Sequence, residues 1–178
     1  AIPFQELTLD AVRNAKMRAR NRGYELMLKS GRGESSNQVI PRDVRANDDL
    51  GLTGGGDNNE YAPAAGTAGT DLTYINSALG NNKFLIIYGF AVVGAQVRPA
   101  ISAIRFKTGS GGANVKAEVD LQRGYAHDIW SWYLDDPVLY GPAETVFIQL
   151  EVAQSWSLGD VLLPLSGYIF EPAGQTVA

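Results

Sequence analysis

The sequence predicts an all-β fold, a β-sandwich or jelly roll of about seven or eight strands, with an N-terminal helix and an extended arm. Three observations carry this prediction. The 20 glycines and eight prolines among 178 residues interrupt the chain too often for a fold of long helices. Beyond residue 70, short segments rich in β-branched and aromatic residues follow one another at intervals of about ten residues. Only one stretch, near the N-terminus, has helical spacing.

Residues 1–70 are predicted to form an N-terminal arm. A helix is expected over residues 8–30, where Leu9, Val12 and Ala19 recur near helical spacing and Gly23 interrupts the pattern. Because its apolar stripe is thin, this helix would be marginal alone in water and needs a surface to lie against. The rest of the arm shows a period of neither 2 nor 3.6, so we expect an irregular polar segment.

Residues 71–178 are predicted to form the β-sandwich body. The expected strands span residues 71–78, 84–93, 101–107, 115–121, 130–134, 145–153 and 161–170. The fifth of these is expected to end at the turn Asp135-Asp136-Pro137, and Pro164 indicates an edge position or a bulge in the last. Because the strand pattern lies beyond residue 70, we expect the body to fold without residues 1–45.

The arm is basic and the body is acidic. Residues 1–45 hold nine Lys and Arg against five acidic residues, whereas the remainder holds six against fourteen. This asymmetry indicates that the arm meets an acidic surface, of a protein or a nucleic acid. The low density of cations, the acidic residues among them and the scarcity of stacking aromatics favour a protein partner. The candidate partner-binding residues are Arg13, Lys16, Arg18, Arg20 and Arg22.

The sequence offers no set of residues for enzyme chemistry. It contains no cysteine, which excludes disulfides, zinc–thiolate sites and a cysteine nucleophile. His127 is the only histidine; its neighbour Asp128 would point to the opposite face of a strand, so a triad with Ser131 is not favoured. One histidine without cysteine also argues against a transition-metal site. We therefore expect a protein that is not an enzyme and has no cofactor.

Two further patterns suggest turns more than ligand sites. The carboxylate pairs Asp48-Asp49 and Asp135-Asp136 lack the spacing of a calcium-binding loop, although a structural ion within residues 48–60 stays open. Gly54–Gly56 lack the following Lys-Ser/Thr of a phosphate-binding loop and are expected to form a flexible turn.

Trp130, Trp132 and Tyr133 are candidate interface aromatics. On one strand, Trp130 and Trp132 would share a face, which suits a carbohydrate platform, a sandwich core or a subunit interface. A place in the core or at an interface is the favoured interpretation.

The closing segment SLGDVLLPLSGYIFEP (residues 157–172) and the preceding WSWY (residues 130–133) resemble cement, or decoration, proteins of tailed-bacteriophage capsids. The resemblance extends over about residues 80 to 175. It implies a jelly-roll or β-sandwich protein of the virion that forms trimers or dimers on the capsid surface and staples neighbouring major capsid subunits.

Two alternatives to a cement protein remain open. One is a shell-forming capsid protein with a single jelly roll, whose basic arm faces nucleic acid. The other is a carbohydrate-binding module that uses Trp130 and Trp132. The first residues lack the profile of a signal peptide, so we expect synthesis in the host cytoplasm. The longest apolar stretch, residues 84–97, is broken by glycines and shorter than the roughly 20 residues of a membrane helix, so no membrane association is expected.

Overall fold

The computed structural model describes residues 4–29, 39–52, 60–94 and 99–172. The helices are α1 (Phe4–Lys29), α2 (Ala46–Leu50) and α3 (Gln122–Tyr125). The strands are β1 (Val39–Asp43), β2 (Asp71–Ala78), β3 (Phe84–Ala91), β4 (Val93–Gly94), β5 (Ile101–Thr108), β6 (Asn114–Asp120), β7 (Ser131–Tyr140), β8 (Thr145–Val152), β9 (Val161–Leu162) and β10 (Leu165–Pro172). The predicted all-β sandwich with an N-terminal helix is confirmed.

The two main sheets are antiparallel and have four strands each. Their orders are β1-β10-β3-β7 and β2-β8-β5-β6, and β4 and β9 form a small third sheet. The long strands pair from the outside of the chain inward: β1 with β10, β2 with β8, β3 with β7, and β5 with β6. An antiparallel ribbon of this kind, rolled up so that its pairs fall into two facing sheets, is a jelly roll.

The main core lies between the two sheets. The alternation seen in the sequence of β8 is reproduced in the structure, where Val146, Ile148, Leu150 and Val152 are all buried. Across from them lie Leu85 and Ile87 of β3 and Ile169 of β10, which belong to the same apolar cluster. The inward faces of both sheets thus hold the body together.

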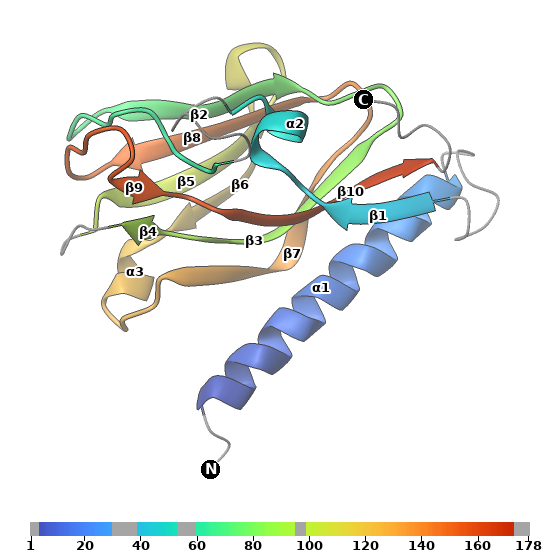
Figure 1. Cartoon of the computed structure of the whole chain (residues 1–178), viewed down its shortest axis with the longest axis horizontal. Coiled ribbons are helices and arrows are strands. Elements are labelled where there is room, and N and C mark those ends of the chain that lie inside the picture. The colour runs from blue at the N-terminus through green and yellow to red at the C-terminus, as the bar shows by residue number, and fades with distance from the viewer. Residues whose placement is uncertain (1–3, 30–38, 53–59, 95–98, 173–178) are drawn as a thin grey trace.

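Helix α1 lies across the outer face of the β1-β10-β3-β7 sheet, which we call the helix-covered sheet (Figure 1). The N-terminal end of α1 extends beyond the sheet. A second apolar cluster fills the space between helix and sheet; it contains Ala15, Ala19, Met27, Phe84, Ile86, Tyr88 and Phe170. The other sheet, β2-β8-β5-β6, has no helix on its outer face among the described elements, and we call it the open sheet.

The predicted irregular segment of the arm contains regular structure. Strand β1 pairs with β10 at the edge of the helix-covered sheet, and α2 follows it. Val44, Leu50 and Leu52 belong to the main core, so this part of the arm packs with the body. The prediction missed both elements because five-residue segments are too short to show a period. The predicted turn at Gly54–Gly56 lies outside the described residues.

Gly23 does not interrupt the helix, contrary to the sequence interpretation. α1 runs through it without a break, and the ring of Phe170 occupies the place where a side chain would be. Gly23 is therefore a point of close approach between α1 and β10, and the helical geometry is unbroken.

The structure also corrects two of the predicted strands. β7 does not end at Asp135-Asp136-Pro137 but continues to Tyr140. Its pairing with β3 passes from Gly89 opposite Tyr133 to Ile87 opposite Val138, so the four residues between Tyr133 and Val138 bulge from the strand. The single strand predicted over 161–170 is divided into β9 and β10, with Pro164 between them, as expected of a residue that cannot donate to a ladder.

Candidate interaction surface

One face of α1 packs on the sheet through three small residues and a methionine. Ala15, Ala19, Gly23 and Met27 recur every four residues and are all buried. Tyr24 contacts Phe170 edge to face, with ring centroids 5.5 Å apart. This inner stripe lets the helix backbone approach β3 and β10 closely and leaves the long side chains of α1 on its other faces.

The five predicted partner-binding cations lie on α1 but do not form one group. Arg18 pairs with Asp135 of β7 at 3.6 Å, and Arg22 pairs with Glu25 at 2.9 Å. Lys29 shares Glu25 with Arg22, at 2.6 Å. The hydrogen bonds from Lys29 and Arg22 lower the pKa of Glu25, so this carboxylate stays charged to lower pH than usual.

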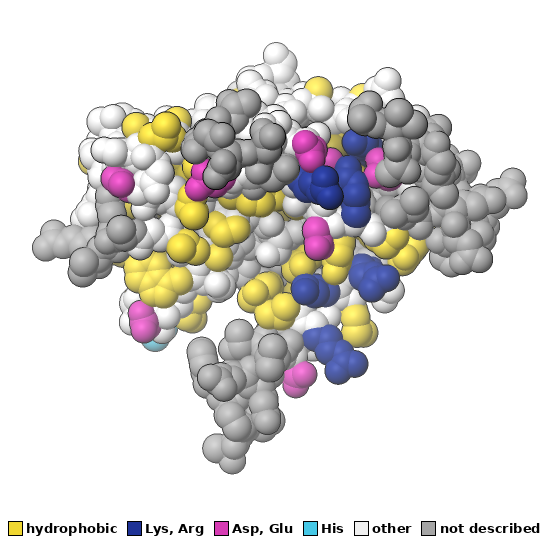
Figure 2. All heavy atoms as spheres, viewed as in Figure 1, with side chains coloured by type: hydrophobic (Ala, Val, Ile, Leu, Met, Phe, Trp, Pro, Cys, Tyr) yellow, Lys and Arg dark blue, Asp and Glu magenta, His cyan; other side chains and the backbone are white. Residues whose placement is uncertain are grey.

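The other three cations of the set, Arg13, Lys16 and Arg20, are exposed and form no ion pair with any residue that the structure describes. Figure 2 shows Lys and Arg side chains gathered along α1 with few carboxylates between them. The sequence identified these residues as basic. The pairs of Arg22 and Lys29 with Glu25 are local to α1, whereas the pair of Arg18 with Asp135 forms only in the folded chain.

The candidate interface aromatics occupy three different environments. Trp132 stacks on Phe90 of the core with ring centroids 5.4 Å apart. Trp130 precedes β7, is 37% exposed, and contacts Tyr125 at 4.9 Å. Tyr133 lies opposite Gly89 of β3 and is 36% exposed. Trp130 and Trp132 therefore do not lie side by side on one strand; they meet through Tyr125, which touches both.

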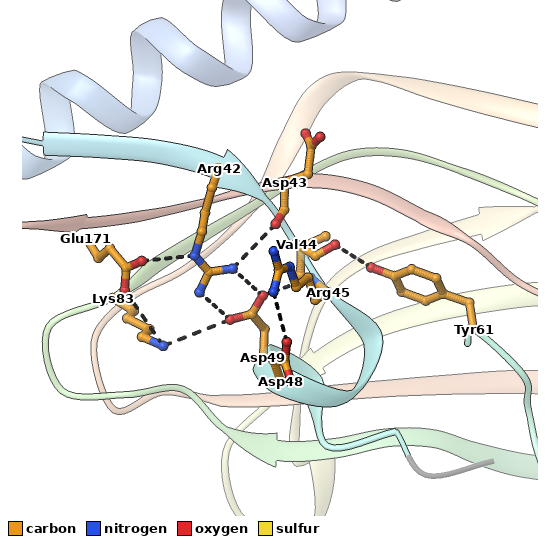
Figure 3. A network of polar contacts seen from close by, with 9 residues as sticks. All are labelled: Arg42, Asp43, Val44, Arg45, Asp48, Asp49, Tyr61, Lys83 and Glu171. Atoms are coloured by element: carbon orange, nitrogen blue, oxygen red, sulfur yellow. Dashed lines mark hydrogen bonds and ion pairs between the residues drawn. The ribbon is translucent and has the colours of Figure 1, made fainter. Parts of the chain in front are cut away.

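A network of charged groups, which sequence reasoning missed, fastens β1 and α2 to the sheet (Figure 3). Asp49 is buried and accepts hydrogen bonds from both terminal nitrogens of Arg42, at 2.7 and 2.6 Å. Arg42 also donates to Glu171 of β10 at 2.9 Å, and Lys83 lies 3.9 Å from Asp49 and 3.8 Å from Glu171. The hydrogen bonds that Arg42 donates to the carboxylate of Asp49 raise the pKa of Arg42, which stays fully charged.

This network determines the role of the carboxylate pair Asp48-Asp49. Both residues lie in α2, and Asp49 also accepts the backbone N–H of Arg45 at 2.8 Å. Its oxygens are thus occupied by cations and an amide of the chain itself. Within the described residues, no group of three or more side chains could hold a metal ion. Part of the 48–60 segment, where an ion was left open, lies outside those residues.

The outer face of the open sheet is polar. Arg105 of β5 lies at its centre and pairs with Glu151 at 2.6 Å, Asp71 at 3.2 Å and Glu118 at 3.4 Å. Hydrogen bonds from Ser102 and Arg105 lower the pKa of Glu151. An open hollow of about 490 Å³ lies beside Ser102, Glu151 and Asp71. Because these groups satisfy one another, the face resembles a solvated sheet surface more than a reaction centre.

His127 and its neighbours do not form a nucleophilic site. His127 is exposed in the loop between α3 and β7, and its backbone N–H donates to Gly124 at 2.9 Å. The carboxylate of Asp128 accepts the indole N–H of Trp130 at 3.0 Å. Asp128 therefore orients the tryptophan, whereas a triad would require it to orient the imidazole.

Comparisons of the chain with models of protein families, with curated proteins and with solved structures find no match. In the part of the chain that the structure describes, no helix is both long and apolar enough to cross a membrane. The fold and its surfaces therefore carry the functional argument by themselves.

Proposed function

We propose that this chain is a structural protein of a virion, a cement or decoration protein. In this proposal it sits on the capsid surface as a dimer or trimer and staples neighbouring major capsid subunits. α1 supplies the contact to the shell, and the jelly-roll body supplies a rigid platform that holds α1 in place.

The observation that carries the proposal is the position of α1. A jelly roll is an architecture of viral shells but also of lectins and cupins, so the body alone does not choose among them. A helix that is attached through an apolar stripe and presents Arg13, Lys16 and Arg20 without an ion-pair partner among the described residues is suited to binding an acidic surface. Many weak contacts of this kind, repeated across a lattice, add avidity.

A shell-forming capsid subunit is the second candidate, and one observation favours it. Four of the exposed large hydrophobic residues lie in or beside the loops at one end of the sandwich, next to β4, β9 and α3: Val93, Ile129, Trp130 and Leu158. Exposed apolar residues at the end of a compact body suit contacts between copies. A carbohydrate platform is less favoured, because the rings of Trp130 and Tyr125 are tilted by 50° and Trp132 packs on the core.

Light scattering and sedimentation test the proposal. The purified protein is measured alone and after mixing with shells assembled without it. A cement protein is expected to form a small closed oligomer that sediments with the shells. Large particles formed by the protein alone would make it a shell subunit, and a small oligomer that stays in the supernatant would refute the cement function.

A further inference from the structure

The cations of α1 fall into two rows on opposite sides of the inner stripe. Arg13, Lys16 and Arg20 are three and four residues apart and form one row. Arg18, Arg22 and Lys29 form the other row, together with Glu25. Each cation of the second row pairs with a carboxylate, Asp135 or the shared Glu25, which offsets two of its three charges. The first row forms no ion pair with a described carboxylate, although Asp10 lies one helical turn before Arg13.

Beside the unpaired row lies an exposed apolar seam. Met17 is 51% exposed and Leu28 is 47% exposed, and the partly buried Tyr24 lies between them. These residues are seven and four positions apart, so they follow one line along the helix, outside the inner stripe. Met17 is four residues after Arg13 and three before Arg20, which places the seam against the unpaired row. Exposed large apolar side chains beside unpaired cations are typical of a binding surface.

The unpaired row and the apolar seam together indicate which kind of partner binds this side of α1. The unpaired row spans seven residues, about 10 Å along the helix, and calls for carboxylates spaced about 5 Å apart. The seam calls for apolar side chains next to them. Duplex DNA would satisfy the cations but would leave Met17 and Leu28 in water, and three cations give little of the salt-dependent affinity typical of such binding.

The open sheet of a second copy fits less well. Its carboxylates Asp71, Glu118 and Glu151 already pair with Arg105, and this face offers the seam no line of large apolar side chains. A partner with carboxylates along the edge of an apolar strip, such as an amphipathic helix of another protein, would pair its carboxylates with the unpaired row and its apolar strip with the seam.

We infer that Arg13, Lys16 and Arg20, together with the seam of Met17 and Leu28, form the docking face of this chain for an acidic, apolar-centred surface of the shell protein. This inference rests on the proposed function. Arg18, Arg22 and Lys29 are already paired, Arg18 with Asp135 of β7 and the other two with Glu25 of α1 itself, and are not part of that face.

Two charge-matched variants separate the rows. R13Q/K16Q/R20Q and R18Q/R22Q/K29Q each remove three positive charges, and glutamine keeps good helix propensity. Circular dichroism and thermal unfolding first establish that both are folded. In sedimentation with shells assembled without the protein, we expect the first variant to bind at least about tenfold more weakly and the second to stay within about threefold of the wild type. M17Q/L28Q, which changes no charge, is expected to weaken binding about fivefold.

The possible contrary outcomes distinguish a failure of the docking face from a failure of the proposed function. Equal losses for the two rows would show general charge attraction and overturn the inference while leaving the cement function standing. Unchanged binding by M17Q/L28Q would remove the seam from the docking face. If the first variant dissociates the oligomer in light scattering, the occupant is a second copy. If it loses only binding to a 20-base-pair DNA duplex, the occupant is nucleic acid, and either result refutes the inference. A wild type that does not sediment with shells refutes the proposed function, and the inference with it.

Discussion

Replacing Gly23 by alanine tests how α1 is held on the sheet. In an exposed helix, glycine to alanine stabilises by about 1 kcal/mol, because alanine loses less backbone entropy on folding. At Gly23 the sign should reverse. A Cβ there would lie 2.6 Å from Cδ2 of Phe170 and closer still to two further atoms of that ring.

The magnitude follows from what can move. Phe170 is fully buried and also contacts Tyr24 and Tyr168, so its ring has no free space to enter. α1 must therefore shift outward or the ring must leave its rotamer, and overpacking of this kind costs about 1–3 kcal/mol. Because the Cβ would lie within 2.6 Å of three atoms of the ring, the upper part of that range, about 2–3 kcal/mol, applies. After the helix-propensity gain of about 1 kcal/mol is subtracted, the net destabilisation of G23A is about 1–2 kcal/mol. At 2–4 °C per kcal/mol for a chain of this size, the midpoint of thermal unfolding falls by up to about 8 °C.

Urea unfolding followed by tryptophan fluorescence and circular dichroism measures the change, and N21A is the control. Asn21 is exposed on the same helix, so its replacement by alanine is expected to be neutral or slightly stabilising. The clash should also be relieved in the F170L background, where G23A is expected to cost less than in the wild type. A G23A protein as stable as N21A would refute the close packing of α1 on β10.

Three further outcomes are expected. Deletion of residues 1–30 should leave the strand signal in circular dichroism but increase the binding of an apolar dye, because it uncovers the outer face of the helix-covered sheet. Deletion of residues 1–45 also removes β1 and should lower the midpoint of thermal unfolding well below that of the shorter deletion. D49A leaves Arg42 without its main partner and should cost about 3 kcal/mol in urea unfolding. D48A, on the exposed side of α2, should cost less than about 1 kcal/mol, and similar losses for the two variants would contradict the network. The free energy of unfolding should also fall above about pH 10, because burial raises the pKa of five tyrosines above that of the unfolded chain, so that unfolding then releases protons. Each tyrosine adds up to about 1.4 kcal/mol per pH unit to the slope, and Y61F should make the slope shallower. A flat profile of stability up to pH 11 would contradict this prediction. These tyrosines are Tyr61, Tyr74, Tyr88, Tyr125 and Tyr140.

Local periodicity was sufficient to predict the class of fold. β8 is the clearest case, because its alternation places four apolar side chains on one face of the strand and the structure buries all four. The same kind of reasoning failed in β6. In the sequence, Val115 alternates with Ala117 and Val119, which predicts that all three lie on one face of the strand. In the structure Val115 is 57% exposed, because the pairing with β5 shifts between Phe106 and Lys107. A bulge moves a side chain to the other face and leaves no mark in the composition.

The amino-acid sequence by itself determined the β-rich body, the single long helix and the basic character of the arm, since each depends on residue types and on spacings within a few turns. The tertiary structure decided which cations pair with carboxylates distant in the chain. Arg18 pairs with Asp135, which is 117 positions away in the chain. Arg42 contacts both Asp49 and Glu171, the second of which is 129 positions away. Such pairings arise only when the strands are brought together, and periodicity cannot report contacts between segments so distant in the chain. For the same reason Gly23 reads as a helix breaker in the sequence, whereas in the fold it is where the helix rests on Phe170.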